Sequence, residues 1–313
     1  MNILITGTTG FVGRHLYKKL AEKHDLFILV RPSTDYKEVC AEHIYIFEDD
    51  IEHLAWYLRE NHIDGIIHLA SLCLVTHQSS QIKDLVLSNI YLGTVLLEAA
   101  KSAGVAWFLN TGSIWQNYLA ADETDEYNPV NLYAATKQAF LTMAKYYTET
   151  SPMRFCTLKL CDTYGPGDTR GKVLSLLKGI AQSGKTLDMS CGEQKLDLLY
   201  IDDVVEGFIC LMNSLNEGTK SLRPEYVLTS GKTMTLRELA TIYEKVCGVN
   251  LSINWGGRPY REREVMNPYR GHKLEGWTPK ISIEEGLALF NKSGGGNFNL
   301  IVNNSQSLER RAA

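Results

Sequence analysis

Short apolar runs alternate with helical apolar periods through the first half of the chain. The runs predict strands at 2–6, 26–31, 43–47, 65–70, 105–111 and 154–160. The segments between them repeat apolar positions every three to four residues, which predicts helices at 11–23, 51–61, 85–103 and 131–148. Nearly continuous apolar strands separated by helices are typical of a parallel sheet covered on both faces. We therefore expect an α/β fold.

Composition narrows the class of protein. The 313 residues can bury a full core, and 44% hydrophobic with 22% charged residues is typical of a globular protein. A net charge of −4 provides no basic field for nucleic acid or an anionic membrane. The start M-N-I-L-I-T-G lacks signal-peptide features, and no apolar run is long enough to span a bilayer. Seven cysteines without a C-x-x-C pair indicate free thiols, so we expect a cytoplasmic protein without a metal site.

The first predicted strand runs directly into G-T-T-G-F-V-G, and a helix follows at once. Glycine lets the backbone turn tightly and approach a pyrophosphate, while the helix N-terminus offers free N–H groups. A strand, a glycine loop and a helix in this order indicate a dinucleotide site. The residues predicted to form it are Gly7, Gly10, Phe11, Val12 and Gly13. The sheet is then of the Rossmann type, a doubly wound parallel sheet.

The end of the second predicted strand bears on the choice of cofactor. Proteins that bind NAD usually carry an acidic residue there, which holds the ribose hydroxyls. In this chain the strand ends V-R-P-S, so Arg31 and Ser33 stand at that place and the first acid is Asp35. A guanidinium can hold a 2′-phosphate with paired hydrogen bonds, which favours NADP(H). An ordinary solvated arginine at a strand end is the alternative.

The alternation becomes irregular after the turn cluster Y-G-P-G-D at 164–168. We expect a dinucleotide-binding domain at 1–163 and a smaller, mainly substrate-binding domain at 164–292. The helix predicted at 201–215 would pack back on the first domain. Residues 293–313 are rich in Gly, Asn and Ser, which predicts a disordered tail.

Tyr133 and Lys137, in Y-A-A-T-K, share one face of a predicted helix because they lie four residues apart. Alone, the two residues could be a solvated pair on a helix surface. They occur together with a series of further motifs: D-I at 50, H-L-A-S at 68, N-I-Y-L-G-T at 89, T-G-S at 111, Y-G-P-G-D at 164 and Y-I-D-D-V at 200. With these motifs and the glycine loop, residues 1–290 resemble the extended short-chain dehydrogenase/reductase family of sugar-nucleotide epimerases, dehydratases and reductases.

The resemblance implies a catalytic set of Ser113, Tyr133 and Lys137. Tyr133 would give its proton to the oxygen formed as hydride reaches a carbonyl carbon. Lys137 would lower the pKa of the tyrosine and hydrogen-bond the nicotinamide ribose. Ser113 would hydrogen-bond the substrate oxygen.

The resemblance also assigns residues along the cofactor. Asp50 and Ile51, after the third strand, match the family's contact with adenine. Leu69 and Ala70, after the fourth strand, would lie along the cofactor. Asn89 is expected to have a structural role.

The surroundings of the catalytic set bear on the reaction. Dehydratases of the family carry an acid pair in T-D-E where this chain has T-G-S-I-W-Q, so elimination of water lacks its acid and base. Epimerases recycle bound NAD and have no use for a 2′-phosphate site. Arg31 therefore favours a reductase.

Asp162, in D-T-Y-G, stands where many members of the family have Asn. In this respect the chain is similar to bacterial 4-ketoreductases, especially CDP-abequose and CDP-paratose synthases, which reduce a CDP-linked 4-keto-3,6-dideoxyhexose for surface polysaccharide. We predict an NADPH-dependent 4-ketoreductase of this kind. The alternatives are a sugar-nucleotide 4-epimerase with bound NAD and a non-catalytic NADP-binding protein.

Two departures from the family concern the substrate. Leu196-Asp197 replaces the frequent Arg-Asp, so a cationic contact is missing or supplied elsewhere. Arg258, Arg261 and Arg263 in G-R-P-Y-R-E-R lie near the place where the family holds the pyrophosphate, although a solvated charge run would look the same. The predicted substrate contacts are Ser113, Asp162, Arg258 and Arg261.

The helices predicted at 85–103 and 131–148 are long and partly apolar. In the family such a pair commonly forms a four-helix dimer interface, so we expect a homodimer. The same apolar residues could instead cover the sheet.

Overall fold

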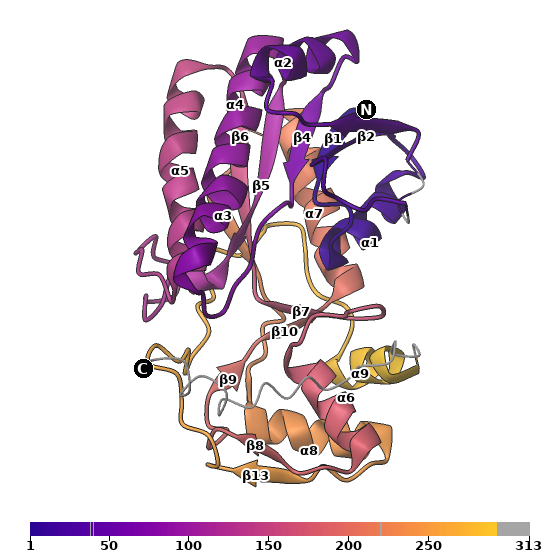
Figure 1. The fold of residues 1–313 in the computed structure, drawn as a ribbon, viewed down its shortest axis with the longest axis vertical. Coiled ribbons are helices and arrows are strands. Elements are labelled where there is room, and N and C mark those ends of the chain that lie inside the picture. The colour runs from indigo at the N-terminus through magenta and orange to yellow at the C-terminus, as the bar shows by residue number, and fades with distance from the viewer. Residues whose placement is uncertain (38, 40, 220, 293–313) are drawn as a thin grey trace, which may run out of the picture.

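A seven-stranded parallel sheet forms the larger part of the protein (Figure 1). The computed structural model describes residues 1–292, except residues 38, 40 and 220, so the predicted tail at 293–313 lies outside the described residues. The strand order is β11–β6–β5–β4–β1–β2–β3, and each neighbouring pair is parallel. The strands are β1 (Asn2–Thr6), β2 (Asp25–Val30), β3 (His43–Ile46), β4 (Gly65–His68), β5 (Trp107–Ser113), β6 (Arg154–Leu160) and β11 (Glu225–Leu228).

Helices cover both faces of this sheet (Figure 1). Successive side chains of a strand point to opposite faces, so Ile3 and Ile5 of β1 enter one core and Leu4 enters the other. The first face packs against α1 (Phe11–Leu20) and α7 (Ile201–Glu217). The second packs against α2 (Ile51–Glu60), α4 (Leu92–Ala103) and α5 (Leu132–Thr150). The predicted α/β fold with a doubly wound parallel sheet is confirmed.

Three local features differ from the sequence-based expectation. The edge strand β11, which pairs with β6, is not among the predicted strands, because it lies in the later part of the chain where the alternation is irregular. The predicted helix at 85–103 starts earlier, as α3 (Ile82–Val86), and passes through a π-helical turn at Leu87–Tyr91 before α4. Strand β5 continues to Ser113, which places this serine at the strand's end.

A smaller part lies beyond the C-terminal edge of the sheet, at the bottom of Figure 1. It contains α6 (Val173–Ser183), α8 (Leu236–Cys247) and α9 (Ile283–Lys292). Three two-stranded sheets accompany these helices: β7 (Asp162–Tyr164) with β10 (Leu198–Tyr200), β8 (Leu187–Met189) with β13 (Ile253–Trp255), and β9 (Lys195–Leu196) with β12 (Met234–Thr235). The chain therefore crosses between the two parts several times.

The strand order reverses between β1 and β4, since β2 and β3 lie on one side of β1 and β4 to β6 on the other. In open α/β sheets, ligands bind beyond the carboxyl ends of the strands at such a switch point. The glycine loop after β1, the segment after β4 and the end of β5 meet at this edge. The smaller part faces the same edge, so a site between the two parts is expected.

The described residues were also searched for a membrane-spanning helix and for a metal site. None of their helices combines the length and the apolar character needed to cross a membrane. No group of three or more His, Cys, Asp or Glu side chains among them is arranged to hold a metal ion. His68 is buried, its Nδ1 lies 2.8 Å from the Thr6 hydroxyl, and burial lowers its pKa to about 3. It is a neutral residue of the core.

Candidate active site

A cavity of about 330 Å³ opens at the switch point of the sheet. Its walls come from the glycine loop, the turn after β2 and the segment after β4. Of the residues predicted to contact a dinucleotide, five line this cavity: Gly7, Gly10, Arg31, Leu69 and Ala70. The cavity lies where the sequence predicts a cofactor, and the other predicted cofactor contacts are not in its lining.

The three loop glycines are required for different reasons. Gly7 has a φ of +77°, and a Cβ on it would lie 2.6 Å from the backbone nitrogen of Ala70. A Cβ on Gly13 would lie 2.1 Å from the Gly7 carbonyl oxygen. For Gly10 the nearest atom would be 3.2 Å away, a much milder contact. Packing explains Gly7 and Gly13, whereas Gly10 leaves open the space that a bound pyrophosphate needs.

Helix α1 presents its N-terminus to the same loop. Its N-cap residue is Gly10, which provides no side-chain hydrogen bond. The first N–H groups of the helix, on Phe11, Val12 and Gly13, have no acceptor one turn earlier in the helix. They carry the positive end of the helix dipole, which suits a phosphate. The Phe11 ring itself is buried beneath the Arg170 guanidinium, 4.3 Å from the ring centroid.

The residues predicted to select the cofactor have distinct positions. Arg31 lines the cavity, and the described residues give its side chain no ion pair. Thr34 lines it as well, whereas Ser33 is exposed in the turn before it. Asp50 accepts a hydrogen bond of 2.9 Å from the His53 backbone N–H and caps α2. Neither Asp50 nor Ile51 lines the cavity, and their contact with adenine stays a prediction.

The start of α5 is held by its N-cap, Asn131. The side-chain oxygen of Asn131 accepts a hydrogen bond of 3.0 Å from the Ala134 N–H. Its amide nitrogen donates to the Val75 carbonyl at 2.9 Å. The helix is thereby joined to the segment that follows β4, and Tyr133 lies in its first turn.

Tyr133 is 8% exposed, and its hydroxyl lies among small polar side chains. Its hydrogen-bonding partners are Ser71, Cys73 and Ser113. The Trp115 ring meets the tyrosine ring edge-on, with centroids 6.4 Å apart. Burial raises the pKa of Tyr133 well above its ordinary value, the neighbouring Cys73 adds to the rise, and the hydrogen bonds with Ser71 and Ser113 oppose it. The hydroxyl therefore keeps its proton at neutral pH.

Lys137 lies one turn further along α5 and is 2% exposed. Its Nζ donates a hydrogen bond of 2.9 Å to the Thr111 carbonyl of β5. Burial lowers its pKa from 10.5 to about 8. A solvated surface pair is therefore ruled out, because both Tyr133 and Lys137 are inside the protein.

Ser113 ends β5 and has two roles. Its Oγ accepts a hydrogen bond of 3.3 Å from the Trp115 N–H, and its own N–H donates to the Gln116 side chain at 2.9 Å. These bonds cap the short 3₁₀ turn at Ile114–Gln116. The same hydroxyl is a partner of Tyr133, so the cap also orients Ser113 toward the tyrosine.

Asn89 fixes the segment after β4. It is 1% exposed and lies in the π-helical turn, which directs its side chain inward. Its Oδ1 accepts hydrogen bonds from the Ser71 hydroxyl and the Leu72 N–H, at 3.0 and 2.8 Å. Its Nδ2 donates to the Leu72 carbonyl and to the Thr136 hydroxyl, at 3.0 and 2.9 Å. All its polar groups are used within the protein, as a structural role requires.

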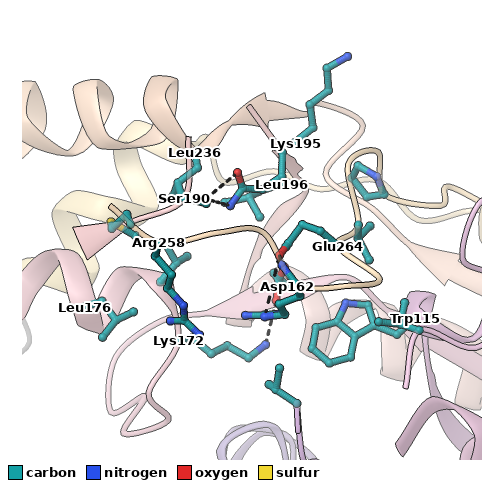
Figure 2. A pocket seen from close by; sticks show the side chains of 18 of the residues that line it. Trp115, Asp162, Lys172, Leu176, Ser190, Lys195, Leu196, Leu236, Arg258 and Glu264 are labelled. Atoms are coloured by element: carbon teal, nitrogen blue, oxygen red, sulfur yellow. Dashed lines mark hydrogen bonds and ion pairs between the residues drawn. The ribbon is translucent and has the colours of Figure 1, made fainter. Parts of the chain in front are cut away.

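A second cavity, also of about 330 Å³, lies between the sheet edge and the smaller part. Three of the predicted substrate contacts line it: Asp162, Arg258 and Arg261. Figure 2 shows Arg258, Lys172, Asp162 and Trp115 directed toward a common space, with Lys195 pointing away from it. The fourth predicted substrate contact, Ser113, is not in this lining, nor is Tyr133, but the lining residue Trp115 meets the Tyr133 ring edge-on.

Some residues of the site were not identified from the sequence. Cys73 lies beside the Tyr133 hydroxyl, and Lys172 and Trp115 line the second cavity. Cys73 follows a predicted parallel strand, and side chains at the carboxyl ends of such strands meet at one edge. That rule could have marked Cys73. No local signal marks Lys172, which lies in an irregular segment.

Comparison with known proteins supports a functional class. The model of the NAD dependent epimerase/dehydratase family matches residues 3–226. CDP-abequose synthase from Salmonella muenchen is 28% identical over 290 residues, covering 91% of this chain and 95% of that protein. The protein of the same name from Yersinia pseudotuberculosis is 29% identical over 277 residues, covering 86% and 92%.

Solved structures agree on the fold. The UDP-glucose 4-epimerase of Thermotoga maritima, determined with UDP-glucose, superposes with a TM-score of 0.80 at 22% identity. The match covers 94% of this chain and 98% of the epimerase. At this identity the likeness shows a shared fold.

Proposed function

The chain belongs to the NAD-dependent epimerase/dehydratase family, and on this premise we propose that it reduces the 4-keto group of a nucleotide-linked deoxyhexose with NADPH. We propose CDP as the nucleotide, in line with the relatives named CDP-abequose synthase. The observation that carries the proposal is the buried, protonated Tyr133, which has Ser113 as a hydrogen-bonding partner, Lys137 one turn away and the cavity residue Trp115 against its ring.

Reduction adds a hydride to the carbonyl carbon and a proton to its oxygen. A bound NADPH would supply the hydride. Tyr133 donates the proton, and Ser113 holds the carbonyl oxygen by a hydrogen bond. The Lys137 ammonium stabilises the tyrosinate that remains until a proton returns from solvent. The products are a secondary alcohol and the oxidised cofactor.

The electrostatics of the site support the reductive direction. A reductase needs its tyrosine protonated when the substrate binds, and burial raises the pKa of Tyr133. Lys137, with a pKa of about 8, is mostly charged at neutral pH. The pair is thus ready to give a proton.

The residues after Ser113 argue against a dehydratase. Ile114 is buried and apolar, and Trp115 packs against Tyr133. The hydrogen-bonding partners described for Tyr133 are two hydroxyls and a thiol. Elimination of water needs an acid and a base, and these groups provide no carboxylate for it.

Arg31 supports NADP(H) as the cofactor, because this residue lines the first cavity and carries a guanidinium. Arg31→Asp removes this cation and adds a like charge beside the 2′-phosphate. We expect NADPH binding to weaken by roughly 2–3 kcal/mol, the scale of charge-assisted hydrogen bonds, while NADH binding is spared.

Fluorescence titration with both cofactors measures the effect. Lys37→Asp, at an exposed residue of the same turn region, is the matched control. Unchanged discrimination in Arg31→Asp would contradict the assignment.

The second cavity supports a nucleotide sugar as substrate. Arg258 lines it, and the described residues give its guanidinium no hydrogen bond or ion pair. It is therefore available to a pyrophosphate. Arg261 is 4.0 Å from Glu264, and Asp162 is 3.1 Å from Lys172. We propose Arg258 as the principal pyrophosphate contact, with Arg261 and Asp162 beside the substrate.

A 4-epimerase is the second candidate function. It is favoured by the shared fold with the UDP-glucose 4-epimerase of Thermotoga maritima. An epimerase would return its hydride to the same sugar and consume no cofactor. A non-catalytic NADP-binding protein is the third candidate, and it would bind cofactor without any turnover.

One experiment separates the three candidates. The pure protein is mixed with NADPH and, in turn, CDP-, dTDP-, GDP- and UDP-linked 4-keto-6-deoxyhexoses, and absorbance at 340 nm is followed. We expect stoichiometric loss of NADPH with the CDP-linked sugar. In a parallel assay with nucleotide sugars that carry a 4-hydroxyl, conversion of one C4 epimer into the other without net loss of NADPH would establish the epimerase instead. Cofactor binding without either reaction on any of the sugars would favour the non-catalytic protein.

We also propose a homodimer. Exposed apolar side chains gather on α3, the π-helical turn and α5, which lie against one another. They are Val86, Leu87, Tyr91, Met143 and Tyr146, each between 38% and 58% exposed. We expect light scattering to give twice the chain mass, and Met143→Lys to give a monomer, because a charge cannot be buried there without a partner. A monomeric wild type at working concentration would contradict the proposal.

The cellular setting follows from the proposed reaction. The cysteines that the structure describes are free thiols, as in a reducing compartment. We therefore propose a cytoplasmic reaction that prepares a deoxyhexose donor for surface polysaccharide, including lipopolysaccharide O-antigen.

A further inference from the structure

An ion pair lies inside the second cavity. Lys172 immediately precedes α6, and Asp162 begins β7. The Lys172 Nζ lies 3.1 Å from Asp162 Oδ1, and the two side chains are 36% and 30% exposed. Both residues line the cavity, and Figure 2 marks the contact between their side chains with a dashed line and shows Arg258 directed toward the same space. The pair therefore faces the space assigned to the substrate.

Two arginines near this space have partners of their own. Arg261 lies near Glu264, and Arg263 is 4.6 Å from the centroid of the Tyr118 ring and donates to Asn128. Among the described residues, the lining cations whose side chains have no hydrogen bond or ion pair are Arg258 and Lys195, and Figure 2 shows Lys195 pointing away from the space. A nucleotide-sugar pyrophosphate carries two negative charges, so Arg258 alone leaves one of them uncompensated.

Leu196 leaves the cavity with one cation fewer for the pyrophosphate than the family's frequent Arg-Asp would give. It stands in the cavity wall beside the buried Asp197, and its apolar side chain cannot pair with a phosphate. The carboxylate of Asp197 is used within the protein, since it accepts hydrogen bonds from the Thr229 hydroxyl and the Ser230 N–H. A second cation must therefore come from another element of the cavity.

We propose that Lys172 is this second cation and binds the phosphoryl group of the nucleotide sugar, with Asp162 as the residue that positions its ammonium. The proposal rests on the proposed function, because it takes a nucleotide sugar as the ligand. A lysine ammonium has three N–H donors, and one of them serves Asp162 Oδ1. The other two are free to reach a phosphate.

The position of Lys172 reinforces the proposal. Lys172 is the N-cap of the eleven-residue helix α6, and its side chain makes no capping hydrogen bond to the helix. The positive end of the helix dipole thus adds to the ammonium charge at the same place. Asp162 has the opposite effect, because its carboxylate repels a phosphate while it orients the lysine.

Because Lys172 attracts the phosphate and Asp162 repels it, substitutions of the two residues should change CDP binding in opposite directions. Lys172→Gln removes a charge-assisted contact, and we expect it to weaken CDP binding roughly ten- to a hundredfold. Asp162→Asn keeps the shape but removes the repelling charge, so CDP should bind at least as tightly as to the wild type. If the pair were only a structural bridge, either substitution would break it and both would change binding in the same direction.

The experiment is calorimetric titration of wild type, Lys172→Gln and Asp162→Asn with CDP, UDP, dTDP, GDP and CMP. We expect Lys172→Gln to lose most of the preference for CDP over CMP, which a structural role would leave unchanged. Lys185→Gln, at an exposed lysine beyond α6 and outside the cavity lining, is the control. NADPH titration and the unfolding midpoint establish that each variant is folded.

The outcomes separate this inference from the function on which it rests. Equal CDP affinity in wild type and Lys172→Gln, or parallel losses in both variants of the pair, would overturn the role of Lys172 and leave the reductase intact. Failure of the wild type to bind any of the nucleoside diphosphates would overturn the proposed function together with this inference.

Discussion

Tyr133→Phe is expected to lower the turnover of the sugar substrate by a factor of roughly 10²–10⁴. The variant removes only the hydroxyl that donates the proton. Its present partners keep other bonds, since Ser71 still donates to Asn89 and Ser113 still accepts from the Trp115 N–H. The fold and NADPH binding should therefore persist. Steady-state rates with the sugar identified by the NADPH assay, together with NADPH titration, measure both properties.

A matched control is available in the loop before the same helix. Tyr127→Phe removes the hydroxyl of a side chain that is 43% exposed and lines neither cavity, and it should leave the rate unchanged. Ser113→Ala should reduce the rate less than Tyr133→Phe, because the tyrosine can still protonate a loosely held carbonyl. If Tyr133→Phe keeps most of the reductase activity, the assignment of the proton donor is wrong.

Lys137→Met is expected to be at least as damaging to turnover as Tyr133→Phe. It removes the charge that stabilises tyrosinate and the donor proposed to hold the nicotinamide ribose. The double variant with Tyr133→Phe should be little worse than the more damaged single variant, because residues that act as one unit are not additive. Rates of the two single variants and the double variant form the cycle that measures this coupling.

The same substitution should preserve or raise stability. Burial lowers the pKa of Lys137 from 10.5 to about 8, which disfavours its charged form by roughly 3 kcal/mol. Methionine has a similar length and no charge, and the variant loses one hydrogen bond, to Thr111, worth about 1 kcal/mol. Denaturant unfolding at pH 7 measures the balance. A large loss of stability would show that the ammonium is a structural requirement.

The pH dependence follows from the direction of this shift. Between about 8 and 10.5 the unfolded chain holds the Lys137 proton and the folded protein does not, so this residue's contribution to the free energy of unfolding rises with pH. The difference in stability between wild type and Lys137→Met should change accordingly over that range. For catalysis, kcat/KM for NADPH should fall above about pH 8, because the free enzyme then loses the ammonium.

Much of the fold could be predicted because its signals are local. The apolar runs that became β1 to β6, and the helical periods that became α1, α2, α4 and α5, each depend on residues close together in the chain. The glycine loop was equally readable, since the conformation of Gly7 and the crowding at Gly13 involve neighbouring backbone. The family resemblance rested on such motifs, and the family match confirms it.

The surroundings of the candidate site were less predictable. The motif Y-A-A-T-K indicated that Tyr133 and Lys137 share a face, but not that both are buried. Ser71 and Cys73 follow β4, which lies beside β5. They reach Tyr133 because Asn89 holds this segment through the Ser71 hydroxyl and the Leu72 N–H. The π-helical turn that directs Asn89 inward has no local sequence pattern of its own.

The sequence by itself thus determined strands β1 to β6 and the phosphate loop, since helical and strand periods and glycine conformations depend on a few adjacent residues, and its family resemblance marked the candidate catalytic residues. Only the tertiary structure decided which side chains meet. Lys172 and Asp162 are ten residues apart and belong to different elements, and Arg258 comes from a much later segment. Their meeting in one cavity depends on how the smaller part packs against the edge of the sheet, and that packing depends on contacts between distant parts of the chain.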